Sequence, residues 1–309
     1  MTVLSPPYSG FLSLKFGQAM PKTKHPLHGV GTPHPNGHFY SPVCDPDDLA
    51  ARREEIWPQP PAPCLGIDFD DASHLRVLTE WFPRFIRDYD YPEEGPEDRD
   101  LEFFYTQNSQ FSWLDSRALF VIMRALAPKR VIEVGSGYSS LLMADVNRRF
   151  LGGVSEIQCV EPYPRAFLKR GVPGLTRVTV ERVQSVPLSA FEALEADDIL
   201  FIDSSHVGKT GSDVNYLFFE VLPRLRPGVV IHVHDIFLPE DYLQDWAIND
   251  NRSWNEQYLL RALLMYSGAF KPMFGCYYAW LTHQAAVIKA LDLPSGAGFG
   301  GGSFWLVRT

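Results

Sequence analysis

The sequence has few cysteines and no long apolar run, and both absences narrow the class of protein. The 309 residues include four cysteines, which are far apart and lack the spacing of a metal or redox motif: Cys44, Cys64, Cys159 and Cys276. This usage is sparse for a disulfide scaffold, so we expect ordinary reduced thiols. The longest apolar stretches, such as 118–123, are far shorter than the roughly 18–20 residues needed to span a bilayer. We therefore expect no membrane partner.

Positive charge is also scarce. The sequence has 28 Lys and Arg against 37 Asp and Glu, a formal net charge of −9 with histidine neutral, and it has no run of basic residues. Because phosphate binding needs a clustered positive field, this balance argues against nucleic acid as a partner. The N-terminus includes Lys15 and lacks the continuous apolar core of a signal peptide. The expected location is the cytoplasm, and the expected partner is a small-molecule substrate.

Proline divides the chain into two parts. Fifteen of the 25 prolines fall within the first hundred residues. Because proline removes a backbone donor and fixes φ, residues 1–127 are predicted to form a Pro-rich N-terminal extension and a helical cap, with 36–41 as a candidate lid. Residues 1–63 contain four histidines whose irregular spacing indicates solvated loops rather than a metal site: His25, His28, His34 and His38.

Beyond Pro128, short apolar runs alternate with amphipathic segments. The predicted strands are 130–134, 157–161, 176–180, 198–203, 229–234, a run near 270–274 and 303–307. The predicted helices are 71–86 and 115–126 before this region, then a helix from residue 139, 165–169, 213–225, 255–265 and 278–291. Continuous Val, Ile and Leu runs separated by helices are typical of a parallel sheet covered on both faces. We therefore predict a doubly wound α/β domain over residues 128–309.

The first candidate site is a glycine turn at the end of the first predicted strand. Residues 131–140 read VIEVGSGYSS, a strand, a turn and a helix start. Glycine lets the backbone approach a ligand closely, and a helix N-terminus offers free N–H groups. A dinucleotide fingerprint has a third glycine where this sequence has Ser140. Glu133 lies just before the turn, where a carboxylate would repel a diphosphate but suits the ammonium group of an amino-acid-like ligand.

An acidic residue follows the next strand. Glu161 lies 24 residues after Gly137, at the end of the second predicted strand. An acid at this position can bind the two hydroxyl groups of a ribose. Enzymes that use NAD and enzymes that use S-adenosylmethionine share this feature, so it does not separate the two classes. A surface glutamate at a strand end is the simpler alternative.

With these motifs, residues 130–309 resemble the class I S-adenosylmethionine-dependent methyltransferases. The resemblance implies a Rossmann-like, seven-stranded sheet whose last strand, 303–307, is antiparallel. It also implies a set of cofactor-binding residues: Glu133, Gly135, Ser136 and Gly137 in the loop, Glu161 at the ribose, Gln184 at the adenine and Asp203 beside the sulfonium.

Acidic and histidine residues follow two later strands. Asp203 and His206 follow one predicted strand, and His234 and Asp235 follow the next. In open α/β sheets the ligand crevice lies at the carboxyl ends of the strands, so these four residues are expected to converge. His232 alternates onto the same face as His234, and we interpret it as a core histidine.

These residues resemble the metal-dependent O-methyltransferases that modify sugars and natural products. In that group a D-x-x-H pair supplies a metal carboxylate and a general base, and an acidic pair ends the next strand. The resemblance implies that Asp203 and His206 are catalytic, with His206 as the base for an attacking hydroxyl. A divalent metal ion would be held by Asp203, Asp235 and His234, which replaces the first acid of the pair. Because Mg²⁺ prefers oxygen ligands, that replacement favours a different ion or none.

We therefore predict an S-adenosylmethionine-dependent methyltransferase acting on a small molecule or sugar, at a hydroxyl oxygen. The main alternative is a NAD-type Rossmann oxidoreductase, against which the missing third glycine and Glu133 weigh. A metal-dependent hydrolase would need more ligands at other strand ends than the sequence offers. Two flanking segments, 104–113 and 254–258, mix aromatic and amide side chains as pocket walls do. The sequence leaves a monomer and a homo-oligomer open.

Overall fold

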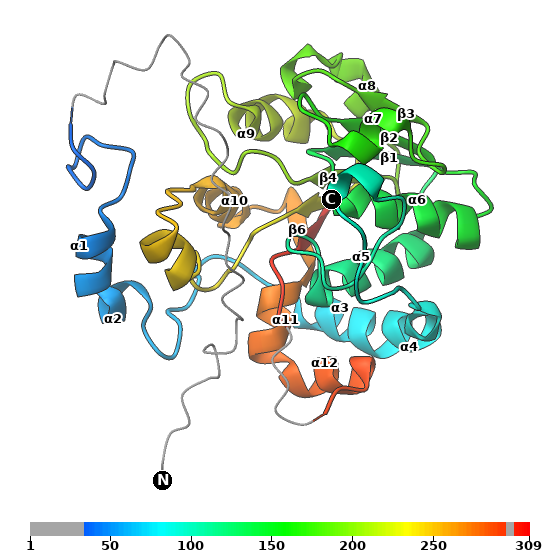
Figure 1. Ribbon diagram of the computed structural model, residues 1–309. Helices are drawn as coiled ribbons and strands as arrows, with labels where there is room; N and C mark the ends of the chain where they lie inside the picture. The colour runs from blue at the N-terminus through cyan, green and yellow to red at the C-terminus, as the bar shows by residue number, and fades with distance from the viewer. Residues whose placement is uncertain (1–33, 295–299) are drawn as a thin grey trace.

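Figure 1 shows the computed structural model, which describes residues 34–294 and 300–309. These residues form a seven-stranded sheet in the order β3-β2-β1-β4-β5-β7-β6. The strands are β1 (Arg130–Val134), β2 (Glu156–Val160), β3 (Arg177–Thr179), β4 (Ile199–Ile202), β5 (Val230–Val233), β6 (Phe270–Gly275) and β7 (Phe304–Arg308).

Helices cover both faces of this sheet and extend beyond it (Figure 1). The α-helices are α1 (Pro46–Ala51), α2 (Arg53–Ile56), α3 (Asp71–Arg76), α4 (Phe82–Phe85), α5 (Trp113–Leu126), α6 (Tyr138–Phe150), α7 (Ala166–Arg170), α8 (Leu188–Glu192), α9 (Asp213–Tyr216), α10 (Glu256–Leu264), α11 (Cys276–Thr282) and α12 (Gln284–Leu291). Wider, π-helical turns lie at Val77–Trp81, Leu217–Val221 and Asp245–Asn249. Tighter, 3₁₀ turns lie at Ile86–Asp88, Asp98–Asp100, Val183–Ser185 and Leu222–Arg224.

The directions of the strands confirm the predicted fold class. β1 pairs in parallel with β2 and β4, β2 with β3, and β4 with β5. β7, predicted at 303–307, runs antiparallel between β5 and β6. The result is a Rossmann-like α/β sheet with a reversed last strand. Its parallel strands present their carboxyl ends at one edge, which is where ligands bind in such sheets.

The central strands are apolar on both sides, so the sheet is buried between two helical layers. In β1, Val131 belongs to one hydrophobic cluster and Ile132 to a second. In β4, Phe201 and Ile202 divide between the clusters in the same way. Because side chains alternate along a strand, the first cluster packs against α5 and α6 and the second against α9 and α10.

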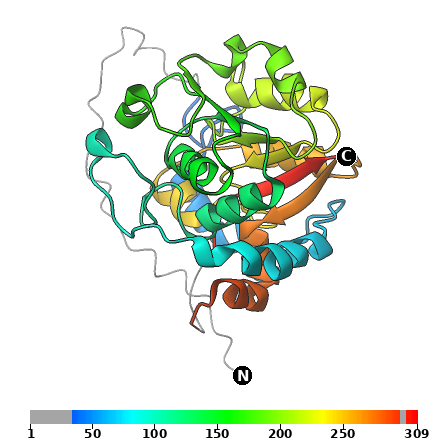
Figure 2. The same ribbon diagram turned by 90° about the vertical axis from the view of Figure 1, so that its right-hand side faces the viewer.

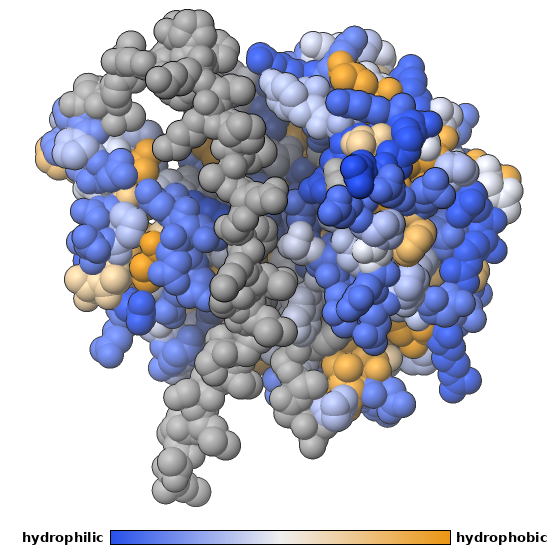
Figure 3. All heavy atoms as spheres, viewed as in Figure 1, coloured by the Kyte–Doolittle hydropathy of each residue, from blue (hydrophilic) through white to orange (hydrophobic). Residues whose placement is uncertain are grey.

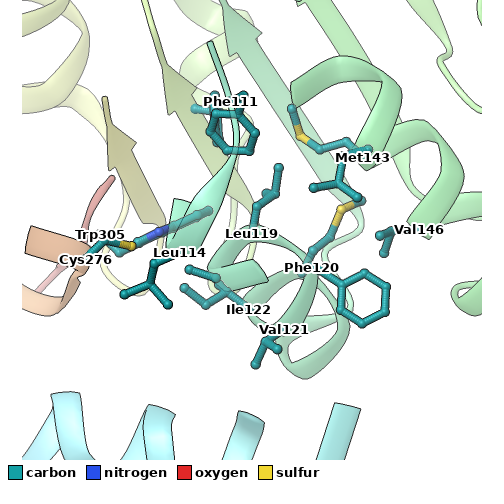
Figure 4. Packing of buried hydrophobic residues seen from close by; sticks show 14 of the residues in the cluster. Phe111, Leu114, Leu119, Phe120, Val121, Ile122, Met143, Val146, Cys276 and Trp305 are labelled. Carbon is teal, nitrogen blue, oxygen red and sulfur yellow. The ribbon is translucent and has the colours of Figure 1, made fainter. Parts of the chain in front are cut away.

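Helix α5 is central to the first cluster. Figure 4 shows Leu119 and Phe120 of α5 among the residues packed with Met143 and Val146 of α6. Figure 2 shows the two helices together in front of the strands. Helix α5 precedes the predicted boundary between residues 127 and 128, yet its apolar face packs on the sheet. Residues 77–126 therefore contribute to the same core as the sheet domain.

Several predicted helices are irregular. The 71–86 segment forms α3, a π-helical turn and α4, and the 213–225 segment forms α9, a π-helical turn and a 3₁₀ turn. In both, a proline (Pro83 or Pro223) stands two residues after the π-helical turn. Proline has no N–H and its ring clashes with the carbonyl four residues before it, so the regular helix cannot continue. The segment predicted as one helix at 278–291 is two helices, α11 and α12.

Part of the N-terminal region lies against the segment that follows β5. The indole N–H of Trp57 donates to the carbonyl of Tyr242 at 2.7 Å. The backbone N–H of Cys44 donates to the hydroxyl of Ser253 at 2.9 Å. Residues 34–63 and the segment after β5 therefore pack together on one side of the carboxyl edge of the sheet.

The surface of the described residues agrees with the charge of the sequence. Most described atoms on the face in Figure 3 are hydrophilic. In the ranges 34–294 and 300–309, no helix combines the length and apolar composition that crossing a membrane requires. His34 and His38 stack on each other, with ring centroids 4.3 Å apart. His25 and His28 lie outside the described residues.

His74 attaches α3 to the end of β6. Its Nε2 accepts the N–H of Gly275 at 2.8 Å, and its Nδ1 lies 3.1 Å from the carbonyl of Asp70. The first contact requires an unprotonated Nε2, so the ring is neutral with its proton on Nδ1. Burial lowers the pKa of His74 to about 4.

We expect His74 to make the fold less stable in mild acid. Between pH 6.5 and 4 the unfolded chain binds a proton at this ring that the folded protein does not bind. Its contribution is therefore present above the unfolded pKa and is lost as the pH falls toward the folded pKa. From pH 7 to pH 4, urea unfolding of the wild type is expected to lose ~3 kcal/mol more than that of His74→Gln. Equal pH dependence in the two proteins would contradict the assignment, and His38→Gln, outside this contact, should behave as wild type.

Candidate active site

The predicted site residues meet at the carboxyl edge of the sheet. Gly135 follows β1, Glu161 follows β2, Asp203 follows β4 and Asp235 follows β5. Since β1 pairs with β2 and β4, and β4 pairs with β5, these strand ends are neighbours. The topology therefore brings together residues that are a hundred positions apart in the sequence.

Gly135 allows two of these strand ends to touch. Its φ is +80°, and a Cβ at this position would lie 1.8 Å from the carbonyl oxygen of Asp203. The N–H of Asp203 donates to the carbonyl of Val134 at 2.9 Å, which holds the two backbones in this contact. A residue with a side chain fits neither the conformation nor the space. The glycine turn therefore lies directly beside Asp203.

Gly137 has a different environment. In the described structure the nearest atoms to a Cβ built there are the Nε of Arg165 at 3.9 Å and the Oε1 of Gln110 at 4.0 Å. The N–H of Gly137 donates to the hydroxyl of Ser140 at 3.1 Å, which caps the start of α6. The space over Gly137 is thus open to a ligand of modest thickness.

Glu133 is fully buried beneath the turn. Its carboxylate accepts hydrogen bonds from the hydroxyls of Ser139 and Ser140, each at 2.5 Å, and from the thiol of Cys159 at 3.1 Å. Burial raises the pKa of Glu133 to about 7, although these donors oppose the rise. The carboxylate therefore anchors the first turn of α6. A direct contact with a ligand's ammonium group would require one of these bonds to be replaced.

Polar atoms without partners line the same edge. Glu161 accepts hydrogen bonds from two backbone N–H groups, one of them Ser136 at 3.1 Å, and keeps lone pairs for further donors. Gln184 follows β3 and donates to the carbonyl of Gly211. Within the described residues, the Oε1 of Gln184 and the hydroxyl of Ser204 are buried and unpaired. Such atoms mark places where a polar ligand can bind.

Asp203, His206 and Asp235 form a compact cluster at the ends of β4 and β5. The Nε2 of His206 lies 3.4 Å from an oxygen of each carboxylate. The three side chains offer donor atoms within 4.8 Å of one another, so they could hold a metal ion. His206 and Asp235 both have φ of +58°, a left-handed conformation that is strained for residues other than glycine. Strain of this kind is concentrated at functional sites.

His234 flanks the same carboxylates from the other side. Its Nδ1 lies 3.2 Å from Asp235 and 3.6 Å from Asp203, measured to the Oδ1 atoms. Two imidazoles therefore bracket two carboxylates. His232, by contrast, stacks on Phe201 with ring centroids 3.7 Å apart, and burial lowers its pKa well below the usual value. This is the neutral core histidine that the sequence indicates.

Two buried carboxylates support the histidines from outside the sheet. Glu256, the first residue of α10, lies 3.0 Å from the Nδ1 of His206. Asp115, in the first turn of α5, accepts two backbone N–H groups of segment 302–303 and lies 3.5 Å from the Nε2 of His234. Glu256 falls in the predicted pocket wall at 254–258, but sequence reasoning missed Asp115. An acid in the first turn of a helix is so common that it gave no distinct signal.

Neighbouring charges set the protonation of the cluster. Burial lowers the pKa of both histidines, but hydrogen bonds to Asp203 and Glu256 raise the pKa of His206 to about 10. The carboxylates likewise raise the pKa of His234 well above its usual value. Burial raises the pKa of Asp203, but the two imidazoles lower it to about 2. In this arrangement both imidazoles are cationic at neutral pH, with a proton on each ring nitrogen.

Comparison with known proteins gives a family model and a relative of related sequence. Residues 132–236 match a family model described as a methyltransferase domain. An uncharacterized protein of Archaeoglobus fulgidus is 37% identical over 173 residues, which cover 55% of this chain and 77% of that protein.

Solved structures with a similar fold include two O-methyltransferases. A putative O-methyltransferase from Klebsiella pneumoniae is 15% identical, with a TM-score of 0.36 over 75% of this chain and 89% of that chain. The O-methyltransferase from Bacillus cereus in complex with S-adenosylhomocysteine is also 15% identical, with a TM-score of 0.38 over 78% and 92%. At these scores neither match bears on the ligand or the reaction of this chain.

Three observations define a Rossmann-like methyltransferase: the fold, the glycine turn followed by an acid on the next strand, and the family match. Residues 132–236 therefore form a methyltransferase domain on this sheet, and the combination indicates the class I S-adenosylmethionine-dependent methyltransferases. The site residues fit the cofactor that this family implies. Glu161 can accept the ribose hydroxyls, the free Oε1 of Gln184 can accept an amino group, and the space over Gly137 can admit the ligand.

We expect Gly135→Ala to be more damaging than Gly152→Ala. Both glycines have positive φ, but a Cβ at Gly152 would have no atom within 4 Å, whereas at Gly135 it would strike the Asp203 carbonyl. The left-handed conformation alone costs ~1–2 kcal/mol per alanine. The clash should therefore make Gly135→Ala less stable in urea unfolding by a further ~2 kcal/mol or more. Equal losses in the two variants would contradict the close contact between the strand ends.

Proposed function

We propose that this methyltransferase acts on a hydroxyl oxygen of a small molecule, such as a sugar or a natural product. The supporting observation is the group of two imidazoles and two carboxylates beside the glycine turn. A hydroxyl must lose its proton as it attacks, so a positioned proton acceptor accelerates the reaction. A hydroxyl is a poor nucleophile until its proton is removed, so a cluster of this kind favours oxygen.

His206 is the proposed proton acceptor. When bound, S-adenosylmethionine supplies a methyl group on a sulfonium, a leaving group that needs no acid. Transfer of that methyl group to the acceptor oxygen would leave the electron pair of the broken carbon–sulfur bond on sulfur. The hydroxyl proton passes to the Nε2 of His206. Glu256 at the Nδ1 fixes the orientation of the ring and stabilises the imidazolium that forms.

We assign the role of base to His206 and not to His234 because Trp254 lies beside His206. The ring of Trp254 lies 4.4 Å from the ring of His206. Trp254 belongs to the segment before α10, and its indole gives the acceptor an apolar surface next to the base. His234 is packed under Phe111, with ring centroids 5.3 Å apart, on the side of α5. His206 thus faces the segment before α10, whereas His234 faces a residue that precedes α5.

His206 could accept a proton from the acceptor hydroxyl if a cation neutralised the carboxylates beside it. The ring accepts a proton only in its neutral form, and Asp203 and Asp235 favour the charged form. A divalent cation held by Asp203, Asp235 and His234 would offset those charges, and it would lower the pKa of an acceptor hydroxyl. One histidine among the ligands suits an ion such as Mn²⁺ better than Mg²⁺.

Cofactor binding is the first test. Calorimetry should show binding of S-adenosylhomocysteine and none of NADH. Glu161→Gln should weaken binding by about tenfold, because it removes charge-assisted hydrogen bonds to the ribose. His206→Gln should retain the wild-type affinity but lose methyl transfer to hydroxyl acceptors, found by screening with methyl-labelled cofactor. Affinity for NADH in place of S-adenosylhomocysteine would support the oxidoreductase alternative and overturn the proposal.

Cation binding is the second test. Titration with Mn²⁺, followed by electron paramagnetic resonance, should detect a site that Asp235→Asn removes. His234→Gln should weaken Mn²⁺ binding by about tenfold or more, whereas His206→Gln should leave it unchanged. The reverse result would make His206 a metal ligand and exclude it as the base. Absence of Mn²⁺ binding in the wild type would contradict the proposed cation.

A further inference from the structure

The residues assigned to the cofactor above are acidic or neutral, but its amino-acid end carries a carboxylate. That end is expected over the glycine turn, and the acidic side chain beneath the turn, Glu133, offers a carboxylate no cationic partner. Buried or half-buried carboxylates need a cationic partner or several hydrogen-bond donors. A partner for this carboxylate must therefore lie elsewhere around the glycine turn.

A pair of polar side chains lies over the open face of Gly137. The Nη2 of Arg165 donates to the Oε1 of Gln110 at 2.5 Å. The Nε of Arg165 and this same Oε1 are the two atoms nearest to a Cβ built on Gly137, at 3.9 and 4.0 Å. The guanidinium and its amide partner thus form the upper wall of the space over the turn.

Both members of the pair are held by their surroundings. Arg165 precedes α7, four residues after Glu161, and its guanidinium lies 5.1 Å from the ring centre of Tyr138. Gln110 is presented by a turn in which the side-chain oxygen of Asn108 accepts the N–H groups of Gln110 and Phe111. The guanidinium is therefore directed toward the turn by stacking, while Gln110 comes from an exposed loop.

We propose that Arg165 binds the carboxylate of S-adenosylmethionine, and that the Oε1 of Gln110 holds the place of one carboxylate oxygen. This inference rests on the proposed cofactor. An amide oxygen and a carboxylate oxygen accept the same donor, but a carboxylate can also bond the guanidinium in a bidentate, charge-assisted way. The carboxylate is therefore the stronger partner and displaces the exposed side-chain amide of Gln110, while the backbone of that turn stays in place.

Arg165 would then determine which adenosyl ligands the protein binds. S-adenosylhomocysteine has the carboxylate, whereas 5′-methylthioadenosine has the same adenosine and sulfur without the amino-acid end. A residue that binds the carboxylate affects the first ligand alone. A residue that only maintains the shape of the turn affects both, and so does Glu161 at the ribose that the two ligands share.

The test is calorimetric affinity for these two ligands. Arg165→Met should weaken S-adenosylhomocysteine binding by about 10- to 100-fold, the value of charge-assisted hydrogen bonds, and change 5′-methylthioadenosine binding by less than about twofold. Arg165→Lys, which keeps the charge without the bidentate geometry, should lose less. Gln110→Leu should leave S-adenosylhomocysteine affinity at or above the wild-type value, because it removes the competing amide.

Two controls separate the outcomes. Glu161→Gln should weaken both ligands, and retained 5′-methylthioadenosine binding shows that Arg165→Met is folded. Equal loss of both ligands in Arg165→Met, or loss of neither, overturns the assignment of Arg165 while the proposed cofactor stands. A wild-type protein that binds neither ligand overturns the proposed cofactor and the assignment together.

Discussion

Mutual compensation of buried charge is the constraint on which this site depends. Asp203 and Asp235 stand side by side at the ends of β4 and β5, and each lies within 3.6 Å of both His206 and His234. Isolated charges in such a place would be costly, so each group persists because the others neutralise it. The same compensation holds the imidazoles in a protonated form, and a change in the charge balance therefore changes what they can do.

The backbone contact between Gly135 and Asp203 joins this charged cluster to the cofactor turn. Because the two strand ends touch, the turn that would hold the donor and the carboxylate that faces the acceptor move as one rigid unit. Methyl transfer needs the donor carbon and the acceptor atom held in line, so rigidity at this junction serves the reaction. The segments around Gln110 and Trp254 approach the site from outside the sheet and lie on loops.

The sequence predicted the sheet well because the signal is local. Continuous apolar runs and the amphipathic segments between them indicate strands and helices whatever their neighbours, and each end of a predicted strand lies within one residue of the observed end. The irregular helices around Pro83 and Pro223 were harder to predict, since the spacing of apolar residues does not reveal a widened turn. The roles of Glu161, Gln184 and His206 stay predictions, although their places at the carboxyl edge agree with them.

By itself the sequence determined the order of the strands along the chain, the glycine turn, and the acids and histidines that follow the strands. The tertiary structure alone decided what those side chains face. It placed Glu133 under the turn with two serines and a thiol, and it brought Asp115 and Glu256, from helices far apart in the chain, onto the two histidines. Contacts of this kind depend on how helices pack over a sheet, and packing joins residues whose separation in sequence carries no pattern.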